Sequence, residues 1–154
     1  MRGADDHAFE QRKATILAIL DDDGDVTVED GGKGVAVRSL EFALDGPRRP
    51  LPTLARFRYG EIHRREGDAW ILADYRYEYL DVEHGGRVAY HWHDLPGRVG
   101  VHHLHCRPPT GRPTMSHFRS YAVDLLEAHD EFIRSYAAGT PIDCSSLRPL
   151  RPDD

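Results

Sequence analysis

Histidine is concentrated in one stretch of this chain of 154 residues, since six of its ten histidines fall between positions 91 and 117. Alternate residues of a β-strand point to the same face of a sheet. His91 and His93 are therefore expected to share one face of a strand, and His103 and His105 to share one face of the next strand. Two His-x-His pairs on neighbouring strands would gather several imidazoles on one surface.

The register of the two strands decides which side chains meet. The segment Asp94–Arg98 contains a Pro-Gly pair and predicts a hairpin loop. Pairing His93 with Val99 across this loop places Arg87 opposite His105. One surface then carries five side chains able to bind protons, metal ions or anions: Arg87, His91, His93, His103 and His105.

Three roles are open to such a surface. Two histidines could act as general base and general acid in RNA cleavage, each typically worth 10²–10⁴-fold in rate. Alternatively, His91, His93, His103 and His105 could supply three or four nitrogens to zinc or another divalent ion. In the third alternative the hairpin is merely polar and belongs to a non-catalytic interaction protein.

Arginine is abundant around the histidines. Residues 46–112 hold 11 arginines, no lysine and 8 acidic residues, whereas residues 1–45 hold 5 basic and 11 acidic residues. Guanidinium groups match the geometry of phosphate oxygens, which makes Arg87, Arg107 and Arg58 candidate phosphate-binding residues. A general use of arginine in place of lysine would produce the same excess.

Several other residues are secondary candidates. His102 and His117 lie close enough in the sequence to join the site. His129 falls on the apolar stripe of a predicted helix and is expected to be a core histidine with its hydrogen bonds satisfied. The two cysteines, Cys106 and Cys144, are too few for a disulfide scaffold, and a reducing cytoplasm is the expected compartment.

Hydrophobic periodicity predicts the elements that would position these residues. Apolar residues from Phe9 to Leu20 have helical spacing, and the acidic run that follows opposes the helix dipole, which predicts a helix end near Leu20. From Val35 the period changes to two, with a phase slip near Ser39 that predicts a β-bulge.

The longest predicted strand contains three alternating tyrosines. They share a face with two smaller apolar residues and are expected to lie in the core: Ile71, Ala73, Tyr75, Tyr77 and Tyr79. The opposite face of this strand, with Asp74, Arg76 and Glu78, is expected to be solvated.

The last helix is predicted from the apolar spacing between Phe118 and Tyr136, with Ser116 as N-cap and Gly139 as C-cap. The order of elements predicts an α+β domain over residues 1–139, an antiparallel meander sheet of about six strands packed with an N-terminal and a C-terminal helix. Residues 140–154 form a Pro/Ser-rich tail.

Composition excludes some classes of protein. The net charge of −6 argues against a general nucleic-acid-binding protein, although the central segment is basic. No apolar run approaches the roughly 20 residues of a membrane span, so we expect no membrane association. The acidic segment Met1–Arg12 lacks the apolar region of a secretory signal, which argues against secretion.

The central residues also resemble a known family. An aromatic strand, Tyr75-Arg76-Tyr77-Glu78-Tyr79, precedes the segment Gly86–Asp94, then His102-His103-Leu104-His105, then a closing helix. This order resembles the TumE-like toxins of bacterial type II toxin–antitoxin systems, over residues 54–138. This chain has His93-Asp94-Leu95 where the family usually has Asp-Asn, and Leu104 where it often has lysine.

The resemblance implies a toxin directed at RNA and a helix-turn-helix antitoxin as its partner, with His102, His103 and His105 in the family motif. Together with the residue chemistry, it predicts a cytoplasmic endoribonuclease that uses histidine acid–base catalysis without a metal. In that prediction His103 and His105 share the acid and base roles with His91 or His93, and Arg87 binds phosphate. The alternative is a zinc-type hydrolase or sensor that uses the same histidines as ligands.

Overall fold

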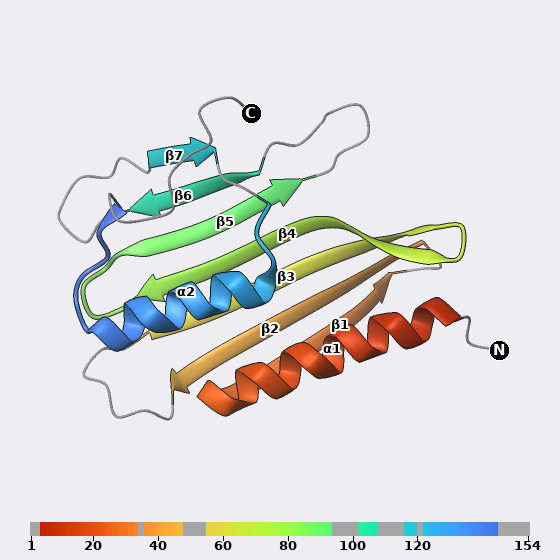
Figure 1. Ribbon diagram of the computed structural model, residues 1–154, viewed down its shortest axis with the longest axis horizontal. Coiled ribbons are helices and arrows are strands. Elements are labelled where there is room, and N and C mark those ends of the chain that lie inside the picture. Colours follow the sequence, from red (N-terminus) through yellow and green to blue (C-terminus); the bar gives the residue numbers. More distant parts are fainter. Residues whose placement is uncertain are drawn as a thin grey trace.

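The computed structural model describes residues 4–33, 36–47, 55–93, 102–107, 116–119 and 122–144. These ranges contain two helices and seven strands (Figure 1). The helices are α1 (Ala4–Asp23) and α2 (Leu125–Ala138). The strands are β1 (Gly24–Lys33), β2 (Val37–Pro47), β3 (Ala55–Glu66), β4 (Ala69–Asp81), β5 (Arg87–His93), β6 (His103–Arg107) and β7 (Ser116–Arg119). The predicted loop Asp94–Arg98 and the tail beyond Cys144 lie outside the described residues.

The strands form one antiparallel sheet in the order β1 to β7, so every strand pairs with its neighbours in the sequence. Both helices lie on the same side of the sheet (Figure 1). We call this side the inner face and the opposite side the outer face. The prediction of an α+β fold with a meander sheet and two terminal helices is confirmed, with seven strands in place of about six.

The core lies between the helices and the inner face. The predicted core tyrosines Tyr75, Tyr77 and Tyr79 are all buried there, and Tyr75 stacks on Tyr77 with ring centroids 4.5 Å apart. Phe132 of α2 stacks against Tyr79 from above. Since alternate residues of each strand face the core, the remaining residues form an outer face that neither helix covers.

One carboxylate is buried on the inner face. Glu61 accepts hydrogen bonds from Arg12 of α1, at 2.5 and 3.0 Å, and from the hydroxyl of Tyr77 at 2.7 Å. His63 lies 2.8 Å from it. Burial alone would raise the pKa of Glu61, but the hydrogen bonds with His63 and Arg12 outweigh burial and lower the pKa to about 2. This network ties α1 to the middle of the sheet.

Both helix predictions need correction at one end. The first helix continues past Leu20 to Asp23, because the Asp23 carboxylate lies 2.7 Å from Nε2 of His129. The second helix begins at Leu125, where Asp124 accepts a hydrogen bond from the Leu126 amide as N-cap. Ser116, the predicted N-cap, belongs to β7 instead. Gly139 is confirmed as C-cap, with φ of 65°.

The β-bulges also differ from the prediction. Strand β2 shows no register shift near Ser39, because Arg38 takes the inner-face position and covers the ring of Phe9, 3.8 Å from its centroid. The shift lies between Ile62 and His63, where β4 has one extra residue. This bulge reverses the phase of β4, so Ile71, predicted in the core, is 40% exposed.

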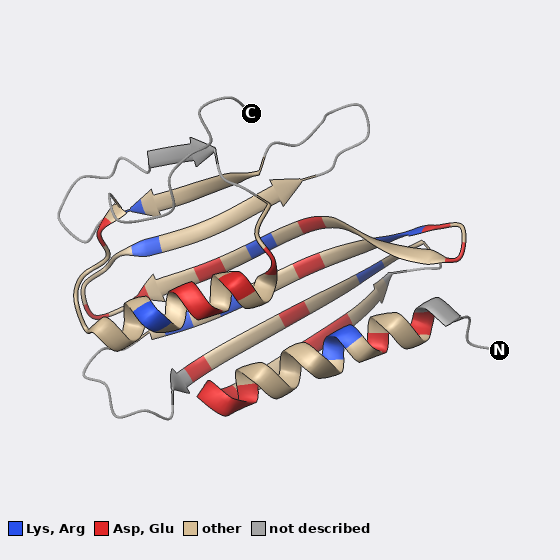
Figure 2. Ribbon diagram, viewed as in Figure 1, with Lys and Arg blue, Asp and Glu red and all other residues tan. Residues whose placement is uncertain are grey.

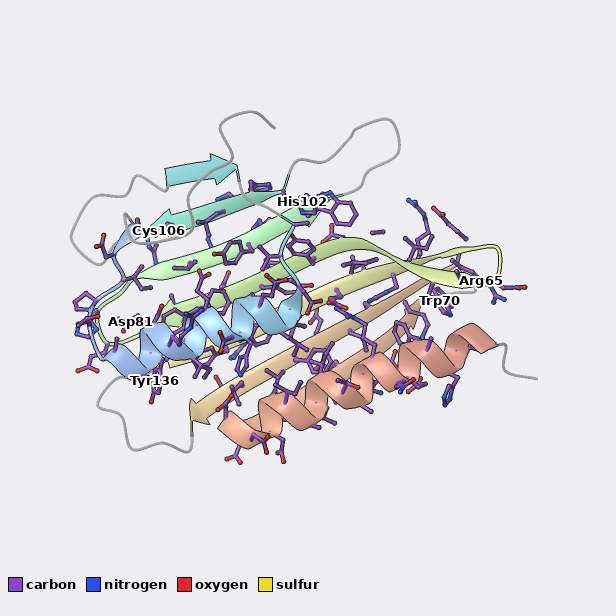
Figure 3. The ribbon with its side chains drawn as sticks, viewed as in Figure 1. Arg65, Trp70, Asp81, His102, Cys106 and Tyr136 are labelled. Atoms are coloured by element: carbon purple, nitrogen blue, oxygen red, sulfur yellow. A yellow bond between two sulfur atoms is a disulfide. The ribbon has the colours of Figure 1, made fainter. Side chains whose placement is uncertain are left out.

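The residues after α2 return to the sheet. Ile142 is buried against Gly86, and Cys144 forms a disulfide with Cys106 of β6. Cys106 lies toward the same end of the sheet as Asp81, and Tyr136 lies on α2 near that end (Figure 3). The expectation of two reduced cysteines is therefore wrong, and the beginning of the predicted tail is part of the domain. No helix in the described ranges has the length and apolar character needed to cross a membrane.

Candidate metal and acid–base site

The histidine strands pair on the outer face, with a register two residues away from the predicted one. Ala89 lies opposite His105, and His91 lies opposite His103. A shift by two residues preserves the face of every side chain. The predicted grouping of His91, His93, His103 and His105 on one surface is therefore confirmed, while the predicted pairing of Arg87 with His105 is wrong: Arg87 lies opposite Arg107.

Three of these imidazoles form a compact group. One nitrogen from each of His91, His103 and His105 lies within 4.8 Å of the other two. The ring centroids are 4.6 Å apart for His91 and His105, 4.8 Å for His103 and His105, and 5.4 Å for His91 and His103. Ligand nitrogens of a tetrahedral zinc ion lie roughly 3.3 Å apart, since each is about 2.0–2.1 Å from the metal. Metal binding would draw the three nitrogens closer together, toward that separation.

His91 is the central member of this group. Its Nε2 atom is buried and forms no hydrogen bond with any residue that the structure describes. Burial, and after it the neighbouring His105 and His103, lower the pKa of His91 to about 3. His91 is thus neutral at physiological pH, which is the form that ligates a metal.

His93 lies beside this group but has a different partner. Its Nδ1 atom is 2.5 Å from the Asp74 carboxylate of β4, which lies directly opposite it. Its ring centroid is 5.9 Å from that of His91 and 6.2 Å from that of His103. A carboxylate on Nδ1 fixes the tautomer in which Nδ1 carries the proton and Nε2 is free to accept one. This geometry is suited to a general base.

His102 belongs to another environment. Its ring stacks on Trp92, with centroids 5.0 Å apart, and its Nδ1 atom lies 2.7 Å from the hydroxyl of Tyr75. Burial lowers the pKa of His102. His102 therefore takes part in inner-face packing near the end of β5 (Figure 3), and the structure does not bring it into the candidate site.

His117 is placed on a strand and not, as expected, at the start of a helix. It lies opposite His105 in the β6–β7 pairing. This position puts its backbone next to the three-histidine group.

Two of the three predicted phosphate-binding arginines are engaged in ion pairs. Arg87 donates hydrogen bonds to Glu78, and Arg58 pairs with Asp45 at 3.0 Å. Arg107 is exposed and lies opposite Arg87. Arg87 and Arg58 are both on the outer face, where carboxylates neutralise their charges.

The sequence interpretation missed Arg76 as a site residue. Arg76 of β4 lies directly opposite His91 of β5 and is exposed. Its strand neighbours Asp74 and Glu78 bind His93 and Arg87 instead, so Arg76 has no ion pair within the described ranges. The alternation along β4 predicted its solvated face, but only the pairing of β4 with β5 reveals its neighbour. Charges of both signs alternate along this strand (Figure 2).

The remaining candidates have structural roles. His129 is buried, with Nδ1 at 2.6 Å from the Tyr59 hydroxyl and Nε2 at 2.7 Å from Asp23. The prediction of a core histidine with satisfied hydrogen bonds is confirmed. Cys106 faces away from the histidines and is held in the disulfide with Cys144.

In comparisons with known proteins, no family model, no curated protein and no solved structure matches this chain.

Proposed function

We propose that this protein is a phosphodiesterase acting on RNA, with a divalent transition metal, of which zinc is the best fit, bound by His91, His103 and His105. The observation that carries the proposal is the convergence of three imidazole nitrogens within 4.8 Å on the face of the sheet that neither helix covers. The buried Nε2 of His91 has no hydrogen-bond partner among the described residues and supports the proposal, because a buried polar atom without a partner costs free energy unless a ligand satisfies it.

Three histidines suit a catalytic metal better than a structural one. Structural zinc sites use four protein ligands, whereas catalytic sites use three and leave a position for water or substrate. His91 and His103 are partly exposed, which leaves solvent access to the group. A metal bound there would polarise a water molecule and neutralise charge on a phosphate oxygen.

The protein's own residues then carry the proton. His93, oriented by Asp74, accepts a proton from the attacking water through Nε2. The water oxygen forms a bond to phosphorus while a phosphorus–ribose oxygen bond breaks. His93 returns the proton to the departing ribose oxygen. One water is consumed for each bond cleaved, and the products are a phosphate monoester end and a free hydroxyl end.

The test combines metal content with cleavage. A mixed RNA pool is incubated with the zinc-loaded protein, with the same protein in excess EDTA, and with EDTA-treated protein to which zinc has been restored. We expect cleavage that EDTA removes and zinc restores. His103→Ala should lose both bound zinc and cleavage, whereas His7→Ala, an exposed histidine of α1, should lose neither. Undiminished cleavage in EDTA, or wild-type protein that binds no metal, would overturn the proposal.

Metal-independent cleavage is the second candidate, and the His93–Asp74 pair favours it. In that reaction His93 takes the proton of a ribose 2′-hydroxyl, the 2′-oxygen bonds to phosphorus, and the 5′-oxygen leaves with a proton from a second histidine. The product end is a cyclic phosphate. Cleavage that persists in EDTA and yields cyclic ends would establish this reaction in place of the metal-dependent one.

The biological setting is also part of the proposal. A toxin that cleaves RNA and is held inactive by a helix-turn-helix antitoxin fits the resemblance to TumE-like toxins. The disulfide between Cys106 and Cys144 does not support the expected cytoplasmic location, because disulfides are more typical of an oxidising compartment. Growth arrest on expression in bacteria, relieved by His103→Ala, would support the toxin assignment.

A further inference from the structure

Two adjoining hollows, of about 320 and 330 Å³, lie on the outer face and share Glu41, Gly60 and Arg76 in their walls. We call the two hollows together the groove. The second hollow also reaches Asp74 and His93, so the groove opens onto the proposed general base. The paired strands place four residues of its walls in one row across the sheet: Glu29, Glu41, Gly60 and Arg76. His91 and His103 continue this row beyond the groove.

Gly60 is responsible for the open floor of this groove. It lies in the middle of β3, where glycine weakens a strand because it has no side chain to pack. The fold does not require glycine at this position, since an added Cβ would meet only the Arg76 carbonyl oxygen, at 3.8 Å. A larger side chain there would project into the space between Glu41 and Arg76 and fill the groove.

Arg76 lies between the groove and the three-histidine group. Its Cα lies about 4.5–5.5 Å from that of His91, the spacing of opposed residues in antiparallel strands. With Asp74 and Glu78 bound to other partners, its exposed guanidinium is available to an anion. At the far end of the groove, Glu29 and Glu41 lie opposite each other and repel further anions.

We propose that the groove over Gly60 is the substrate-binding site of the histidine centre, and that Arg76 binds a single phosphate of an RNA strand there. This inference rests on the proposed function, because it names where that substrate lies. The strand runs from the three-histidine group across β4 toward β2. The two glutamates limit the strong electrostatic contact to the phosphate beside Arg76.

Binding can be measured without cleavage. The probe is a short fluorescein-labelled RNA whose riboses carry 2′-O-methyl groups, and the full chain is kept in EDTA while fluorescence anisotropy is recorded. Gly60→Leu and Arg76→Gln should each weaken binding by tenfold or more. Arg76→Gln should also reduce the slope of log affinity against log salt by about 0.7, the value for one phosphate contact of a single strand.

Arg56→Gln serves as the matched control, because it removes another exposed arginine of the outer face that lines neither hollow. It should bind RNA like wild type. Wild-type affinity of Arg76→Gln, an unchanged salt slope, or no RNA binding by wild type would overturn the inference. The zinc content and hydrolysis of the wild-type protein test the proposed function separately.

Discussion

His91 and His103 lie directly opposite each other across β5 and β6, with ring centroids 5.4 Å apart. His105, two residues along β6 from His103, brings its ring within 4.6 Å of His91. His91 therefore contacts both of the other histidines, and the group depends on the register of this one strand pair. The first prediction follows from this central position.

His91→Ala should abolish stoichiometric zinc binding, because the two remaining nitrogens would bind the metal far more weakly. Elemental analysis of protein equilibrated with zinc measures the loss. His7→Ala, on the exposed surface of α1, is the matched control and should retain all bound metal. Unchanged zinc content in folded His91→Ala would contradict the assignment of the three-histidine group as the metal site.

Asp74→Asn should slow catalysis without changing metal binding. The carboxylate holds the proton on Nδ1 of His93, and an amide can present either a donor or an acceptor there. We expect kcat for RNA cleavage to fall by roughly 10²-fold, within the usual range for loss of a positioned base, with zinc content preserved. Asp68→Asn, at the exposed turn between β3 and β4, provides the control.

If Asp74 acts only in the fold, the rate loss of Asp74→Asn would be independent of pH. If it positions the base His93, the pH profile of kcat should change as well. A variant with normal kcat and an unchanged pH profile would exclude the positioning role.

Much of the fold was predictable because period-two alternation is strong in β3 and β4. The alternation correctly places Tyr75, Tyr77 and Tyr79 in the core, and it correctly assigns the histidines of β5 and β6 to one face of the sheet. Local patterns did not reveal tertiary partners. The helical spacing from Phe118 led to an overlong last helix, whereas β7 takes the first part of that segment to pair with β6.

The sequence predicts the histidines of the candidate site better than it predicts their charged neighbours. The sequence pattern places His91, His93, His103 and His105 on one face, but Arg76 becomes a site residue only through its pairing with His91. Arg87 and Arg58 looked free because their partners Glu78 and Asp45 lie on other strands. The disulfide was also hidden, because spacing alone cannot indicate that Cys144 returns to Cys106.

Glu61 should stabilise the folded protein at neutral pH, and this contribution should be lost in acid. Its pKa falls from 4.5 to about 2 on folding, so the unfolded state binds a proton that the folded state does not. The contribution of Glu61 to the free energy of unfolding is therefore fully present above pH 4.5 and declines as the pH falls toward 2. The shift corresponds to about 3 kcal/mol.

Urea denaturation at several pH values measures this contribution. Glu61→Gln should be less stable than wild type at neutral pH and should lose part of the acid dependence. Glu66→Gln, at the exposed end of β3, should keep the wild-type dependence. Equal acid dependence in Glu61→Gln and wild type would show that other groups control acid unfolding.

The disulfide between Cys106 and Cys144 should stabilise both the domain and its metal site. It closes a loop of 38 residues, for which the chain-entropy model gives about 4 kcal/mol. Cys106 is adjacent to His105, so β6 would lose its covalent link to the segment after α2 on reduction. We expect Cys144→Ser to lower the free energy of unfolding by up to about 4 kcal/mol and to weaken zinc binding. Urea unfolding and zinc titration, each with and without dithiothreitol, test this. Wild type should respond to the reductant and Cys144→Ser should not, and a wild-type protein whose unfolding is indifferent to the reductant would contradict a stabilising role for the bond.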